Sequence, residues 1–153
     1  MAYIPEDAHW YLAEVVLEHT VENDPRNVVH INIHLIEAVS PELAYDKAIA
    51  LGRQSEVCFT NTGGKEVRVA FRGLRQLNVI HDKLEDGAEL TYEEIAGVPE
   101  AELRDLISPK EGLGVFRDRH SGFTTGAPNL MPESIMQKMK DAGFDRDAIE
   151  GGA

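Results

Sequence analysis

Apolar and polar residues alternate along two segments near the start of the chain, 10–21 and 28–39, which predicts two β-strands. Alternate side chains of a strand point to opposite faces. The apolar positions of the first segment are Tyr11, Ala13, Val15, Leu17 and Val21. Those of the second are Val29, Ile31, Ile33 and Leu35, with His30, Asn32 and His34 on the other face. The polar residues 22–27 predict a turn, and hence an antiparallel hairpin with one buried face.

A helical pattern follows the hairpin. Ser40 is a favourable N-cap, Pro41 suits the first helical position, and Glu42 complements the helix dipole. Gly52 fits a C-terminal cap. The apolar residues between these signals recur at helical spacing and can cover a sheet: Leu43, Ala44, Ala48 and Leu51.

Shorter segments complete the predicted fold. Residues 56–60, 66–71 and 74–80 predict strands, with Gly73 as a bulge or bend, and 89–93 is a further candidate strand. Residues 99–107 and 132–142 predict helices. We therefore expect an α+β fold in which an antiparallel sheet, in the order strand, strand, helix, strand, strand, carries one main helix on one face. The expected division is a compact domain over 1–107 and a loop-rich extension over 108–153 that ends in a short amphipathic helix.

Charge narrows the class of partner. The chain has 153 residues and a net charge of -12. Residues 82–105 hold nine acids against Lys83 and Arg104. Clustered acids repel phosphate backbones, so we expect no nucleic acid as a partner, and a basic protein is the electrostatic alternative. The alternative explanation is that the acidity only keeps the protein soluble.

The remaining composition points to a cytoplasmic protein. No apolar run approaches a membrane span, and the first residues lack the pattern of a secretory signal. Cys58 is the single cysteine and is expected to be a small buried residue. We expect no metal and no cofactor, because the sequence holds no ligand set or nucleotide-binding motif for either.

A candidate ligand site lies on the polar face of the predicted hairpin. One register would pair Glu18 with His30 and Glu14 with His34, and a register shifted by two residues would instead place Thr20 and Val16 beside those histidines. Carboxylate–imidazole pairs raise the pKa of the histidine. Two arginines are expected on this face as well, for ion pairs or for an anion pocket with His34: Arg68 and Arg72.

The same face is expected to carry an apolar patch. Strand alternation places four residues there: Trp10, Leu12, Val16 and Ile36. A patch of this kind marks an interface. The C-terminal helix or a second copy of the chain, in a homodimer, would cover it.

Part of the sequence resembles a known family. Three stretches are similar to a small bacterial family catalogued as domain of unknown function 4288. They are the segment 37–44 (EAVSPELA) with Lys47 and Ala48, the positions Phe59, Asn61, Gly64, Val67, Val69, Phe71, Gly73 and Leu74, and Gly87-Ala88-Glu89-Leu90. The resemblance covers about residues 10–95. It implies a bacterial source and a compact α+β sheet with a helix on one face, and it assigns no catalytic residue.

Two functional hypotheses remain open at this stage. The first is a protein-binding or accessory, neutralising module with an acidic surface and no enzymatic activity. The alternative is a small ligand- or metal-binding protein, or an enzyme, that uses the His, Arg and Glu side chains of the hairpin face.

Overall fold

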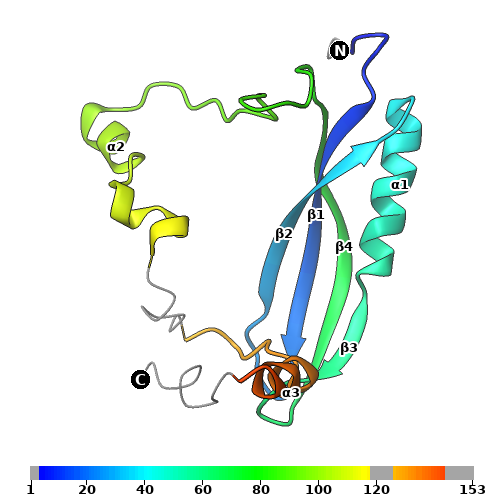
Figure 1. Ribbon diagram of the computed structural model, residues 1–153, viewed down its shortest axis with the longest axis vertical. Coiled ribbons are helices and arrows are strands. Elements are labelled where there is room, and N and C mark those ends of the chain that lie inside the picture. Colours follow the sequence, from blue (N-terminus) through cyan, green and yellow to red (C-terminus); the bar gives the residue numbers. More distant parts are fainter. Residues whose placement is uncertain (1–3, 118–125, 144–153) are drawn as a thin grey trace. The chain divides into compact units, whose positions relative to one another are not determined.

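The computed structural model describes residues 4–117 and 126–143. The chain forms two units, the first within 1–92 and 128–136 and the second within 93–127 and 137–153. The first unit contains the sheet and its main helix (Figure 1). The second contains α2 (Glu100–Asp105) and the 3-10 turns η1 (Lys110–Gly112) and η2 (Gly114–Phe116), and α3 (Glu133–Asp141) begins in the first. None of the described helices is long and apolar enough to cross a membrane.

The sheet has four antiparallel strands in the spatial order β2-β1-β4-β3. Their bounds are β1 (Trp10–Val21), β2 (Val28–Glu37), β3 (Val57–Thr60) and β4 (Glu66–Val79), with α1 (Pro41–Gln54) between β2 and β3 along the chain. This confirms an α+β fold with an antiparallel sheet and a helix packed on it. The spatial order differs from the order along the chain, because β1 and β4 are central and β2 is an edge strand (Figure 1). The candidate strand over 89–93 is wrong, since these residues have no regular secondary structure.

Strand β4 is one long strand rather than two. Its register with β1 shifts twice, and each shift inserts one extra residue into β4, Arg75 and Arg72. Gly73 lies between them with φ of 136°, which a residue with a side chain rarely adopts. The large apolar residues of β4 are spaced by two, two, three, three and two positions, and the two bulges keep all six on the face of α1: Val67, Val69, Phe71, Leu74, Leu77 and Val79.

Helix α1 begins as the sequence predicts and ends later. Leu43 N–H donates to Ser40 Oγ at 3.2 Å, which confirms the N-cap. Gly52 is not the C-terminal cap, because the helix continues to Gln54 and Ser55 caps it. Gly52 is needed for another reason: a Cβ at this position would lie 2.4 Å from the Phe71 ring. The helix thus meets the sheet closely, through its small residues Ala44, Ala48 and Gly52.

The register of the hairpin corrects the sequence analysis. His34 lies opposite Ala13 and His30 opposite Leu17, so neither proposed pairing with Glu14 and Glu18 forms. The observed register differs from both predicted ones by an odd number of residues, which exchanges the two faces of β2. Ile36 is therefore buried on the α1 side, packed with Tyr11 and Ala38 in the core, and it does not lie on the opposite face as predicted.

A segment near the C-terminus is attached to the turn between β3 and β4. Asn61 is 2% exposed, and its Oδ1 accepts hydrogen bonds from Gly63 N–H and Lys65 N–H, both at 2.9 Å. Its Nδ2 donates to the Asn129 carbonyl at 2.9 Å, and Thr62 N–H donates to the Met131 carbonyl at 2.9 Å. The amide side chain of Asn61 thus holds both the turn after β3 and the segment that contains Asn129 and Met131.

Replacing Gly52 by Ala should lower the free energy of unfolding by about 1–3 kcal/mol, because the methyl group overlaps the Phe71 ring. This is opposite in sign to the gain of about 1 kcal/mol that Gly→Ala gives in an exposed helix. The double variant with Phe71→Leu should recover part of the loss. Urea denaturation measures all three proteins, and a stabilised Gly52→Ala variant would contradict the close contact.

Replacing Asn61 by Asp keeps the oxygen that accepts from Gly63 and Lys65 but removes the donor to Asn129. We expect faster amide hydrogen exchange at Met131, together with a stability loss of about 1–3 kcal/mol for the unmatched buried group. The control is Asn129→Asp, which removes the exposed donor to Thr62 Oγ1 but keeps the oxygen that accepts from Met131 N–H. Unchanged exchange in Asn61→Asp would show that this side chain does not hold the segment.

Candidate functional site

The most unusual surface of the sheet is the face away from α1. Because of the hairpin register, four aliphatic side chains of β2 lie there, with exposed fractions of 37% to 59%: Val29, Ile31, Ile33 and Leu35. Alternation in β1 adds Trp10, Leu12 and Val16 to the same face, and Leu12 is only 8% exposed. We call these seven residues the outer apolar face. Three of the four residues predicted for an apolar interface are among them.

A row of charged side chains borders the outer apolar face along β1 and β4. Arg75, the extra residue of one bulge, donates to both oxygens of Glu14, at 2.8 and 3.1 Å. Its hydrogen bonds lower the pKa of the Glu14 carboxyl. Glu18 accepts a hydrogen bond from Asn27 Nδ2 at 2.7 Å. Arg72, the extra residue of the other bulge, lies with its Nε 4.0 Å from Glu18 Oε1. The two predicted site acids are thus each held by neighbouring side chains.

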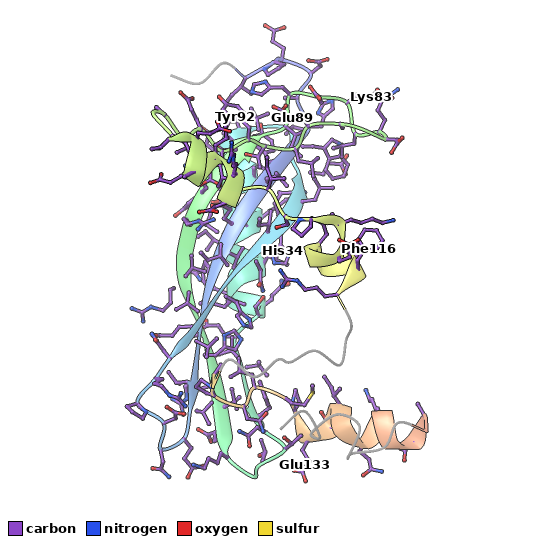
Figure 2. All side chains as sticks on the ribbon, turned by 90° about the vertical axis from the view of Figure 1, so that its left-hand side faces the viewer. His34, Lys83, Glu89, Tyr92, Phe116 and Glu133 are labelled. Carbon is purple, nitrogen blue, oxygen red and sulfur yellow. The ribbon has the colours of Figure 1, made fainter. Side chains whose placement is uncertain are left out.

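The predicted histidines lie on the opposite face, on the α1 side of the sheet. The imidazole rings of His19 and His30 are 4.3 Å apart, between centroids. Burial of His19 and the charge of His30 lower the His19 pKa. His34 lies part way along the sheet (Figure 2), and its Nε2 is buried without a hydrogen-bond partner among the described residues. The predicted site, which combined His30 and His34 with Glu14 and Glu18, therefore does not form.

The predicted arginines do not form an anion pocket with His34. Arg68 lies 3.3 Å from Glu66, and strand β1 separates Arg72 from the strand of His34. Cys58, opposite Arg68 on β3, is exposed, which corrects the expectation of a buried thiol. Within 4–117 and 126–143, no three His, Cys, Asp or Glu side chains are placed to hold a metal ion.

A groove of about 560 Å³ lies between α1 and the bulged part of β4. Arg53 and Arg72 contribute positive charge to it, and Asp46 and Glu56 contribute negative charge. Glu56 also accepts a hydrogen bond from Phe71 N–H at 3.4 Å. The mixed charge selects neither an anion nor a cation, so the groove by itself identifies no ligand.

Sequence reasoning missed Arg75 and assigned the aliphatic row of β2 to the wrong face. A signal for Arg75 was present, because the three-residue spacings from Phe71 to Leu74 and from Leu74 to Leu77 indicate two bulges. The face of β2 had no comparable local signal.

Stability should fall as the pH is lowered from 7.5 to 5.5. The pKa of His19 is below its ordinary value of 6.5 in the folded chain, so below that pH the unfolded state binds more protons. Protonation then favours unfolding. Urea denaturation at both pH values should show a smaller loss for His19→Phe than for the wild type. His81→Phe, at an exposed position, should keep the wild-type loss; equal losses in all three proteins would exclude His19 as the source.

One of three comparisons with known proteins identifies the family of the chain. The family described as domain of unknown function (DUF4288) matches residues 10–92, which is more than half of the chain and includes the whole sheet. Searches of the curated proteins and of the solved structures gave no match. The chain belongs to the DUF4288 family.

Proposed function

We propose that this protein is a protein-binding module that holds a partner polypeptide on the outer apolar face. The observation that carries the proposal is the exposure of Val29, Ile31, Ile33 and Leu35 in one row. Large contiguous apolar surfaces on soluble domains mark interaction sites. The four side chains come from one regular strand and are therefore presented on a rigid element rather than on a loop.

The surroundings of the face favour recognition of a polypeptide over a small molecule. An open sheet surface lacks the concave shape that encloses small ligands. The charged row of Glu14, Arg75, Glu18 and Arg72 gives the face a polar border, as in protein interfaces with an apolar centre and a polar rim.

Charge favours a basic partner. The chain has a net charge of -12, and nine acids lie in 82–105. All nine of these acids are exposed. Acidic surfaces raise the association rate with basic proteins, and salt weakens this effect.

The competing hypothesis, a ligand-binding or enzymatic site built from His30, His34, Glu14 and Glu18, loses its geometric basis. The histidines and the carboxylates lie on opposite faces of the sheet. No second function is proposed from them.

Affinity purification followed by quantitative mass spectrometry tests the proposal. The double variant Val16→Gln/Leu35→Gln should reduce recovery of a stoichiometric partner at least tenfold, because it places two polar amides on the outer apolar face. The matched control is Val39→Gln, which alters an aliphatic side chain that is 80% exposed and lies outside the strands.

Changing the nine acids of 82–105 to amides should make the partner's recovery less sensitive to salt. Equal recovery with the wild type and the Val16→Gln/Leu35→Gln variant would reject the outer apolar face as the binding surface. Unchanged salt sensitivity in the amide variant would reject the basic partner and leave the face itself in place.

A further inference from the structure

Within 4–117 and 126–143, no strand pairs with the edge of β2 that faces away from β1, and this edge has a defined set of backbone groups. Ala38 N–H donates to the His9 carbonyl at 2.9 Å, and these residues continue the register of β1 with β2. Hydrogen-bonded and non-hydrogen-bonded pairs alternate in an antiparallel ladder. The even-numbered residues of β2 therefore bond to β1. The backbone N–H and C=O groups that point to the open edge belong to Val29, Ile31, Ile33 and Leu35.

The sequence of strand β2 and its pairing with β1 show none of the local features that normally protect an edge. Edge strands are usually short, bulged, or interrupted by lysine or proline, since an open edge otherwise pairs with another strand. Residues Val28–Glu37 (VVHINIHLIE) contain no Lys, Arg, Pro or Gly, and their pairing with β1 is without a bulge. The single charged residue of the strand is Glu37, at its end. A strand of this kind needs a second strand or another segment to cover the backbone groups of its open edge.

We propose that the cover is β2 of a second copy, paired antiparallel around a two-fold axis at Asn32. The two four-stranded sheets then join into one sheet across the dimer. In this register Ile31 lies opposite Ile33 of the second copy, and Val29 lies opposite Leu35 of the second copy. Each of these pairs uses the outward backbone groups of both residues, so the hydrogen bonds of one edge match those of the other.

The side chains select this register over its neighbours. All four aliphatic residues face aliphatic residues of the second copy, and Asn32 faces Asn32, whose amide can both donate and accept. Moving the axis to Ile33 would set the carboxylate of Glu37 opposite Val29. Moving it to Ile31 would set Leu35 opposite Asn27, beyond the start of β2. In the chosen register Glu37 faces Asn27, so no like charges lie opposite one another.

On the α1 side of the sheet, the same pairing would bring a hydrogen-bonding side chain of the second copy close to His34. His34 Nε2 is buried and makes no hydrogen bond to the described residues. An added strand in the proposed register places His30 of the second copy opposite His34. A second imidazole, which carries both a donor and an acceptor, then lies beside the unmatched nitrogen.

Disulfide trapping tests the position of the axis. Asn32→Cys, made with Cys58→Ser, should give a disulfide-linked dimer under mild oxidation. Opposite residues of a non-hydrogen-bonded pair have Cα atoms about 4.5 Å apart, within the range that a disulfide spans. The control is His30→Cys with Cys58→Ser. Its two cysteines would lie four residues out of register, about 13–14 Å apart, and should remain reduced.

Molar mass in solution tests the edge itself. Sedimentation or light scattering of the wild type should give twice the chain mass of 17.0 kDa. Ile33→Pro should give the mass of one chain, because it removes an outward N–H that the β1–β2 ladder does not use, and proline is tolerated on the free side of an edge strand. Ile33→Val, which keeps the N–H, should remain dimeric.

The results separate the possibilities. A wild type of 17.0 kDa at about 100 μM, or a dimer without the Asn32→Cys disulfide, overturns the proposal. A second copy stacked on the outer apolar face instead would leave Asn32→Cys reduced, because Asn32 lies on the α1 side of the sheet. The inference concerns the backbone edge of β2, so it does not rest on the proposed function, and either can fail without the other.

Discussion

The pairing of β1 with β2 determines which side chains of β2 lie on each face of the sheet. Leu17 lies opposite His30 and Ala13 opposite His34, so the polar alternate residues of β2 lie on the α1 side of the sheet. A displacement by one residue would exchange the two faces. With the observed pairing, Ile36 joins the core beneath α1, and the aliphatic row from Val29 to Leu35 is left on the other side. The candidate binding face is a direct consequence of this register.

Small residues allow α1 to lie close to the sheet. Ala13, Ala44 and Ala48 are fully buried, and Gly52 touches the ring of Phe71. The helix covers the core around Tyr11 and Ile36, and it leaves the face that carries Val29, Ile31 and Ile33 open.

The bulges of β4 connect packing with charge. Each adds one residue, and together they keep Leu74 and Leu77 on the same face as Phe71. The added residues are Arg72 and Arg75, and these guanidinium groups lie beside Glu18 and Glu14 on the neighbouring strand. The two bulges that keep apolar residues in the core thus also position the charged row that borders the outer apolar face. Exposed ion pairs of this kind contribute about 0–1 kcal/mol each to stability.

Local patterns in the sequence determined the elements of the fold. Period-two alternation located β1 and β2, and the Ser40 cap with small apolar residues at helical spacing located α1. These signals act between residues that are near one another along the chain, and they do not depend on the rest of the fold. Tertiary structure alone decided the register of β2, the burial of Ile36 and the extension of α1 through Gly52, because each depends on contacts between distant segments. An alternating strand fits either face equally well until the helix and the central strand determine which face is buried.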